Sequence, residues 1–202
     1  MTPTIHIIDD DISLRDALDS LFRSVDLKTR TYGSVQQFLD AAVGDTPGCL
    51  VLDVRLPGLS GLDFQSRLAS LGVTQPAILM TGHGDIPMSV QAMKAGAVDF
   101  LAKPFRDQDM LDAVTAALAR DAQRRVGTAD LTALRAAFDT LSSREQQVMT
   151  LVTSGLMNKQ VAASLDLSEM TVKIHRGSAM RKMGARTFAD LVRMADGLGL
   201  RG

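Results

Sequence analysis

The sequence predicts a doubly wound α/β domain with a five-stranded parallel sheet, followed by an all-α domain of four helices that includes a helix-turn-helix. In the first 120 residues, short apolar runs alternate with longer amphipathic stretches, which is the pattern of successive βα units. After Arg120 only helical periodicity remains. The chain of 202 residues is long enough to bury two small cores, so we expect two domains.

The first domain, residues 1–120, is expected to contain five strands, each followed by a helix. The strand-like runs and the helical stretches after them lie at 5–8 and 14–22, 29–32 and 35–42, 50–52 and 62–71, 77–80 and 88–95, and 100–101 and 110–118. Short connections between parallel strands place helices on both faces of the sheet. Binding sites in such sheets form beyond the carboxyl ends of the strands.

Residues 121–139 are polar and rich in alanine, and Gly127 and Thr128 interrupt their pattern. We interpret this segment as a linker that is partly helical. The net charge of -1 hides an asymmetry: residues 1–120 carry 15 acidic and 10 basic side chains, whereas the rest of the chain carries 8 acidic and 12 basic ones. This mild basic excess fits a second domain that meets a polyanion.

The second domain, residues 140–202, shows helical stretches at 142–154, 158–165, 168–183 and 187–196. Three glycines stand at predicted helix ends, where a positive φ is needed: Gly155, Gly184 and Gly197. Ser142 and Glu145 have the spacing of a capping box. Each of these signals supports four separate helices.

The single cysteine, Cys49, excludes an intramolecular disulfide. It lies in the apolar run 49–52, so we expect a buried hydrophobic residue rather than a nucleophile or a metal ligand. The chain opens into a strand-like run without a basic leader, and it contains no run of 18 apolar residues. We therefore expect a cytoplasmic protein that has no membrane segment.

Charged and polar residues follow four of the five predicted strands. The run Asp9-Asp10-Asp11 ends the first strand, Asp53 the third and Thr81 the fourth, and Lys103 with Pro104 follows the fifth. A parallel sheet would gather them around one pocket. Carboxylates that cannot neutralise one another require a cation, and oxygen ligands suit Mg²⁺ or Mn²⁺. With the metal present, one carboxylate can attack phosphorus while Lys103 and Thr81 contact the phosphoryl oxygens.

Residues 3–120 resemble the receiver domain of two-component response regulators, because the acid pair, the lone aspartate, the threonine and the Lys-Pro pair occur in the usual order. The most specific match is Asp-Val-Arg-Leu-Pro-Gly-Leu-Ser-Gly at 53–61. The runs 81–88 and 92–100 further resemble the FixJ-type subgroup. The resemblance implies a cis peptide bond before Pro104.

The same resemblance implies a role for each matching residue. It implies Asp9 and Asp10 as metal-binding carboxylates, Asp53 as the phosphoacceptor and a metal ligand, the Arg55 backbone carbonyl as a further metal ligand, Thr81 and Lys103 as phosphoryl contacts, and Phe100 as the aromatic that turns inward on activation.

Two neighbouring residues have simpler interpretations. Asp11 is favoured as the N-cap of the first helix over a role in metal binding. His83 is favoured as a surface-loop residue over a catalytic base. Considered alone, Lys103 would be a lysine with its charge in solvent and its aliphatic chain packed on the protein. Pro104 directly after it, and the acidic residues at the ends of the other strands, favour a role of Lys103 in the acidic pocket instead.

The second domain combines three features of a helix-turn-helix. A short helix carries Asn158-Lys-Gln-Val-Ala, a turn follows at Asp166-Leu167, and a longer helix begins after Ser168. Ser168 can cap this helix, which leaves its first turns free to enter a DNA groove. At about 100° per residue, its inward face consists of Val172, His175, Ala179 and Met183.

The opposite side of this helix is expected to face DNA. Its groove-facing residues are Lys173, Ile174, Gly177, Ser178 and Arg181, and they are flanked by Thr171, Arg176 and Lys182, which suit contacts to phosphates. The segment from Leu141 to Arg186 resembles the LuxR-type DNA-binding domain, which commonly follows a receiver. Gly177 departs from related domains, which often carry a larger residue there; it either permits close backbone approach or costs about 1 kcal/mol of helix stability.

Together the two resemblances imply a phosphorylation-dependent transcriptional regulator of a two-component system. Its partners would be a sensor histidine kinase, double-stranded promoter DNA and a second copy of the chain that joins on phosphorylation, with RNA polymerase as a further candidate. An alternative is a constitutive dimeric DNA-binding regulator whose receiver is not controlled by phosphorylation. The complete acidic pocket argues against this alternative.

Two classes of enzyme do not fit the motifs. Haloacid-dehalogenase-like phosphatases share an Asp-x-Asp after the first strand, with the nucleophile there. In this sequence that strand ends in adjacent aspartates, and the candidate nucleophile Asp53 follows the third strand. A nucleotide-binding kinase would need GxxxxGK[ST], which the sequence lacks. We therefore expect a phosphoryl acceptor and not an enzyme that turns over a small molecule.

Overall fold

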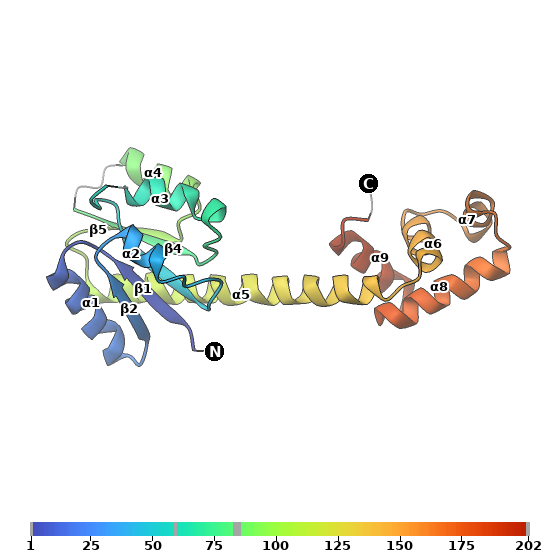
Figure 1. Ribbon diagram of the computed structural model, residues 1–202, viewed down its shortest axis with the longest axis horizontal. Helices are drawn as coiled ribbons and strands as arrows, with labels where there is room; N and C mark the ends of the chain where they lie inside the picture. Colours follow the sequence, from blue (N-terminus) through green and yellow to red (C-terminus); the bar gives the residue numbers. More distant parts are fainter. Residues whose placement is uncertain (1, 59, 83–85, 201–202) are drawn as a thin grey trace. The chain divides into compact units, whose positions relative to one another are not determined.

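The computed structural model describes residues 2–58, 60–82 and 86–200, and the chain divides into two compact units (Figure 1). The first unit is Met1–Arg124 and the second is Arg125–Gly202. The boundary between them falls inside the segment predicted as a linker. Within the described ranges, no helix is both long and apolar enough to cross a membrane.

The first unit is built on a five-stranded sheet in which every pairing is parallel. Its strands are β1 (Thr4–Ile8), β2 (Lys28–Tyr32), β3 (Gly48–Asp53), β4 (Ala77–Thr81) and β5 (Asp99–Ala102). Their order across the sheet is β2-β1-β3-β4-β5, so the predicted doubly wound α/β class is confirmed. The winding reverses between β1 and β3, and this switch point is where such sheets place their sites.

Helices cover both faces of the sheet, as predicted. They are α1 (Ile12–Ser24), α2 (Val35–Asp40), α3 (Gly61–Arg67) with the 3-10 turn Ala69–Leu71, α4 (Ile86–Lys94) and α5 (Asp107–Asp139). Phe22 of α1 and Val114 of α5 belong to the core on one face, whereas Phe38 of α2 and Phe64 of α3 belong to the core on the other.

Cys49 lies on β3, whose residues are all buried. Burial is the main cause that raises the pKa of its thiol to about 12, and the charge of Asp121 adds to the effect. A thiol that stays protonated in an apolar core is neither a nucleophile nor a metal ligand. The predicted role of Cys49 as a small buried hydrophobic residue is confirmed.

The predicted linker is helical throughout, which corrects the expectation of a partly helical segment. Helix α5 continues from Asp107 to Asp139, and Gly127 and Thr128 lie within it rather than interrupting it. The Thr132 hydroxyl donates a hydrogen bond to the Thr128 carbonyl oxygen at 2.9 Å, one turn earlier. One glycine costs a helix about 1 kcal/mol, which the surrounding strong helix formers offset.

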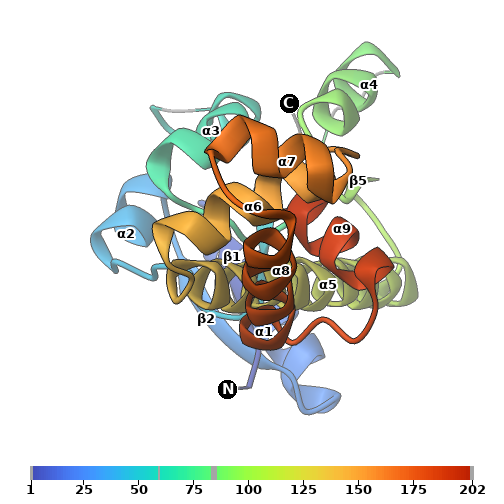
Figure 2. The same ribbon diagram turned by 90° about the vertical axis from the view of Figure 1, so that its right-hand side faces the viewer.

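The described part of the second unit contains the end of α5 and four further helices, as predicted: α6 (Ser143–Thr153), α7 (Asn158–Leu165), α8 (Glu169–Met183) and α9 (Phe188–Gly197). Figure 2 shows this unit from a second direction. Helix α8 contacts α6, α7 and α9. Val148, Val161, Val172 and Leu191, one from each helix, are fully buried in a shared core.

The predicted helix ends of this unit are mostly confirmed. Ser142 and Glu145 form both bonds of the capping box. Gly155 and Gly184 have φ values of 100° and 72°, in the left-handed region that glycine tolerates. The prediction for Gly197 is wrong, because it is the last residue of α9 and the positive φ of 69° falls at Gly199 instead.

Candidate functional site

Three carboxylates gather at the switch point of the first unit. Asp9 follows β1 and Asp53 ends β3, and these two strands are neighbours in the sheet. Asp9, Asp10 and Asp53 each offer a carboxylate oxygen, and these oxygens lie within 4.8 Å of one another. Asp9 is fully buried and Asp53 is 6% exposed, whereas Asp10 is exposed. The predicted clustering of these residues is therefore present.

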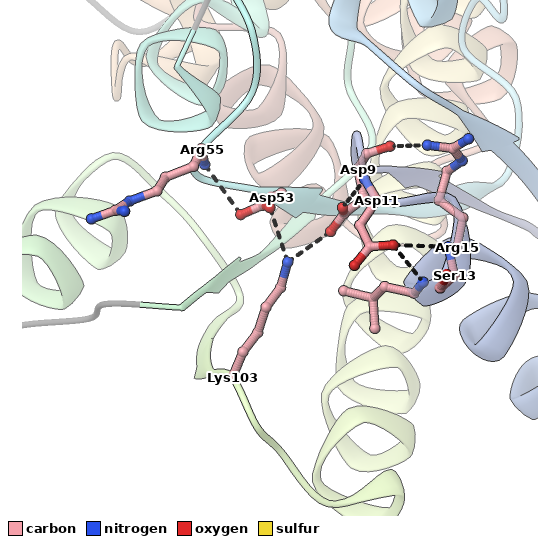
Figure 3. Close-up of polar contacts among 8 residues, drawn as sticks. Asp9, Asp11, Ser13, Arg15, Asp53, Arg55 and Lys103 are labelled. Atoms are coloured by element: carbon pink, nitrogen blue, oxygen red, sulfur yellow. Dashed lines mark hydrogen bonds and ion pairs between the residues drawn. The ribbon is translucent and has the colours of Figure 1, made fainter.

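Lys103 joins the two buried acids (Figure 3). Its Nζ donates to Asp9 Oδ2 at 2.8 Å and to Asp53 Oδ2 at 2.9 Å. Its backbone N–H donates to the Thr81 carbonyl oxygen at 2.6 Å, which ties the end of β5 to the end of β4. The peptide bond from Lys103 to Pro104 is cis, as the resemblance implied.

The electrostatics of this cluster favour an added positive charge. Burial raises the pKa of Asp9, and the nearby Asp53 adds to this, although the hydrogen bond from Lys103 opposes it. Burial alone would lower the pKa of Lys103, but its hydrogen bonds to Asp9 and Asp53 outweigh burial, and its pKa is raised. Lys103 therefore stays charged, and it supplies one positive charge to a cluster with three carboxylates.

The remaining oxygens fit a hard divalent cation. Asp53 Oδ1 accepts a hydrogen bond from the Arg55 backbone N–H at 3.1 Å, so the chain after β3 stays close to this carboxylate (Figure 3). Asp10 and Arg55 line a shared, open hollow of about 590 Å³ on the surface. Carboxylate oxygens with room for water beside them are the donor set that Mg²⁺ prefers. Asp9, Asp10, Asp53 and the Arg55 carbonyl are the residues that could hold such an ion.

Thr81 and Phe100 lie on the two strands beyond Asp53. Thr81 ends β4 and is fully buried. Phe100 lies on β5 and pairs with Leu79 of β4. Its ring is half-buried and packs against the core on one face of the sheet, and Met88 of α4 packs against the same core. The two predicted switch residues are thus on adjacent strands, and the aromatic ring retains partial exposure.

Two smaller expectations concern the loops around the acids. Asp11 is the N-cap of α1, because its carboxylate accepts hydrogen bonds from the backbone N–H groups of Ser13 at 2.8 Å and Leu14 at 3.3 Å. The interpretation of Asp11 as a cap is confirmed (Figure 3). His83 lies outside the described residues.

Helices α7 and α8 form the predicted helix-turn-helix. Asp166 ends α7 with a φ of 54°, and the Ser168 hydroxyl accepts a hydrogen bond from the Thr171 backbone N–H at the start of α8. The inward face is as predicted for Val172, Ala179 and Met183, which are buried, while His175 is half-buried. The expected groove face includes exposed Lys173, Ile174 and Arg181, half-buried Gly177 and half-buried Thr171 at its edge.

Among the described residues, three of the predicted DNA contacts have side-chain partners on other helices of the second unit. Ser178 Oγ and Lys182 Nζ donate to Glu145 of α6 at 2.6 and 2.7 Å. Arg176 donates to the side-chain oxygen of Asn158 on α7 at 3.3 Å. The hydrogen bond from Lys182, followed by that from Ser178, lowers the pKa of Glu145 to about 2. These side chains therefore help to hold α8 against its neighbours.

Two residues of this region were not predicted from the sequence. The sequence predicts only a capping role for Glu145. The helical projection of α8 gives no information on which residue of α6 lies beside Ser178 and Lys182. Met170 was also missed, although it is 65% exposed on α8. Met170 lies two residues before the inward-facing Val172, so the helical projection predicts that it faces outward.

A doubly wound unit with an aspartate–lysine cluster at its switch point, joined to a helix-turn-helix unit, defines a response regulator that acts on DNA. Residues 5–115 match the family of the response regulator receiver domain, and residues 139–195 match the bacterial regulatory proteins of the luxR family. The chain therefore belongs to the FixJ/NarL-type response regulators, which are transcriptional regulators of two-component systems.

Known proteins of this kind are similar over nearly the whole chain. Nodulation protein W of Bradyrhizobium diazoefficiens is 58% identical over 97% of this chain and 86% of its own length. Transcriptional regulatory protein FixJ of Rhizobium meliloti is 41% identical over 95% of this chain and 94% of its own length. The structure of response regulator StyR has a TM-score of 0.82 and 43% identity, covering 97% of this chain and 99% of StyR. Full-length FixJ from B. japonicum has a TM-score of 0.59 and 38% identity, with both chains covered completely.

Proposed function

We propose that Asp53 accepts a phosphoryl group from a sensor histidine kinase, and that this modification promotes dimerisation and sequence-specific binding to promoter DNA. The observation that carries the proposal is the position of Asp53, whose carboxylate is held by Lys103 at 2.9 Å beside the buried Asp9. This arrangement fixes the nucleophilic carboxylate of Asp53 and the charged amino group of Lys103 in one small site.

The chain's own groups suit an in-line transfer. An oxygen of Asp53 attacks phosphorus, the new O–P bond forms, and the P–N bond of the kinase's phosphohistidine breaks. Lys103 then contacts a phosphoryl oxygen, and the Thr81 hydroxyl contacts another. A divalent ion held by Asp9, Asp10, Asp53 and the Arg55 carbonyl would supply further positive charge for the phosphoryl oxygens.

Thr81 and Phe100 provide a route from the site to the surface. Movement of the Thr81 hydroxyl toward the phosphoryl group would leave space that the half-buried Phe100 can fill. The surface formed by α4 and β5 would change, and a second copy of the chain would bind there. Two helix-turn-helix units held together would contact half-sites about one helical turn apart.

The DNA contacts we propose are those expected from the projection of α8: Thr171, Lys173, Ile174, Arg176, Gly177, Ser178, Arg181 and Lys182. Exposed Lys173, Ile174 and Arg181 are the members that support this best. Arg176, Ser178 and Lys182 would have to contact DNA while keeping or exchanging their partners in α6 and α7. RNA polymerase is a further candidate partner once the protein is bound at a promoter.

Intact mass and DNA binding test the proposal together. Acetyl phosphate with Mg²⁺ should add one phosphoryl group to the wild-type protein and none to Asp53→Asn, and EDTA should prevent the addition. Asp63→Asn, which removes an exposed carboxylate of α3, is the matched control and should behave as wild type. Specific DNA binding should rise only where the phosphoryl group is gained. Equal DNA binding with and without the phosphodonor would favour the constitutive dimeric regulator instead.

A further inference from the structure

Two apolar side chains lie exposed on the outer side of α8. Met170 is 65% exposed and Ile174 is 62% exposed, although both residue types are usually buried. They are four residues apart and therefore neighbours on one side of the helix. This side lies opposite Val172 and Ala179, which pack into the core of the second unit. The fold of this unit gives no reason for an apolar pair at this position.

The surroundings of this pair carry a net positive charge, because the exposed basic residues of α8 outnumber its one exposed acid, Glu169. Lys173 and Arg181 are exposed on the same helix. A partner for this side of α8 must therefore carry negative charge and also present apolar groups at close range. The major groove of DNA meets both conditions, because phosphates line its edges and each thymine exposes a C5-methyl group within it.

Gly177 supports a close approach to the same partner. It lies three residues after Ile174 on the same side of the helix. A Cβ added at this glycine would meet Arg181 Nη1 at 3.8 Å, which is an ordinary contact, so packing within the second unit does not require glycine here. A glycine inside a helix is nevertheless unfavourable relative to alanine. Its missing side chain leaves room for another molecule beside Ile174.

We propose that Met170 and Ile174 contact the C5-methyl groups of thymines in the major groove and thereby determine a preference for thymine at two positions of each half-site. The inference rests on the proposed function, because it requires α8 to enter the groove, and it adds Met170 to the residues that determine specificity. Burial of one methyl group against an apolar side chain is worth about fourfold in affinity.

Replacement of thymine by deoxyuridine tests this, because the two bases differ only in the C5-methyl group. Preferred duplexes are first selected from a randomised library with the phosphorylated full-length protein, and each thymine is then replaced in turn. Wild-type affinity should fall about fourfold at each of two positions per half-site. Met170→Ala should lose the sensitivity at one position and keep it at the other, and Ile174→Ala should show the converse.

Leu131→Ala is the matched control, since Leu131 is a 48% exposed apolar residue of the same unit on α5. It should keep both the affinity and the sensitivity to deoxyuridine, and circular dichroism should show all variants folded. A preferred duplex whose binding ignores every deoxyuridine, or a Met170→Ala variant with unchanged sensitivity at both positions, overturns this inference alone. A library that yields no preferred duplex overturns the proposed function as well.

Discussion

His6 is a buried titratable residue of β1 outside the acidic cluster. It is 1% exposed, and its Nδ1 lies 3.1 Å from the Tyr32 hydroxyl oxygen. Among the described residues, its Nε2 has no hydrogen-bond partner. Burial, and to a lesser degree the charge of Arg30, lower its pKa from 6.5 to about 4. Between these two values the unfolded chain binds a proton that the folded first unit does not bind.

We therefore expect the contribution of His6 to the free energy of unfolding of the first unit to fall as the pH decreases from 6.5 to about 4. This contribution is fully present above the pKa of His6 in the unfolded chain, 6.5. As the pH falls to about 4, the free energy of unfolding loses about 3 kcal/mol of it. Tyr32 is the single tyrosine and the chain has no tryptophan, so tyrosine fluorescence in urea titrations monitors this unit. His6→Gln should flatten the pH dependence across the window. A slope that is the same in wild type and His6→Gln would assign it to other groups.

Lys173 provides a second prediction at the scale of one residue. It is exposed on α8, so Lys173→Ala should leave the fold intact and weaken binding to a specific duplex. If Lys173 contacts a guanine edge, the loss is about 1 to 3 kcal/mol and the preference at one base pair relaxes. If it contacts a phosphate, all duplexes weaken alike and the salt slope falls by about one unit. Titrations with specific and scrambled duplexes at several salt concentrations separate these cases, and unchanged affinity for every duplex would place the groove face elsewhere.

The acidic cluster could be predicted from the sequence because the ends of parallel strands meet at one edge of the sheet. That rule alone predicts that Asp9, Asp53 and Lys103 lie close together. The bonds from Ser178 and Lys182 to Glu145 could not be predicted in the same way. These bonds depend on how α6 packs against α8, and the periodicity of one helix gives no information on its packing against another helix.

Helix α5 shows the same limit at the scale of an element. Asp121 was assigned to the linker, yet it is 3% exposed and belongs to the first unit. Its Oδ2 accepts a hydrogen bond at 3.0 Å from the backbone N–H of Gly48, which is 73 positions earlier in the chain. Its Oδ1 accepts from Arg124 at 2.8 Å. A contact between residues so distant in sequence leaves no local pattern, so the sequence alone does not reveal that Asp121 packs with the first unit.

Asp121→Ala should lower the free energy of unfolding of the first unit by about 2 to 3 kcal/mol, because a buried N–H loses a charged acceptor. Asp112→Ala is the matched control: Asp112 is an exposed residue of α5 that accepts a hydrogen bond from Gln108 one turn earlier. Its effect should stay within about 0.5 kcal/mol. Urea titrations followed by Tyr32 fluorescence measure both variants. Equal effects of the two substitutions would show that the bond to Gly48 does not hold α5 against the sheet.

At the scale of the whole molecule, the chain contains separate cores. The two cores of the first unit lie on either side of the sheet, whereas the core of the second unit is formed by its own helices and the end of α5. The net charge also divides with the units, since the first part of the chain is acidic and the rest is basic. Separate cores predict that damage to one unit leaves the chemistry of the other intact.

Val172→Asp tests this independence. Val172 is fully buried in the core of the second unit, so the substitution buries an unpaired carboxylate. The cost should exceed about 4 kcal/mol and unfold this small unit. Circular dichroism should show a loss of helix and specific DNA binding should disappear, whereas Lys173→Ala should stay folded. Uptake of one phosphoryl group by intact mass and the urea transition followed by Tyr32 should both stay as in wild type. A parallel loss of phosphoryl uptake, or a Tyr32 transition that shifts with the helix signal, would show that the two units fold as one cooperative structure.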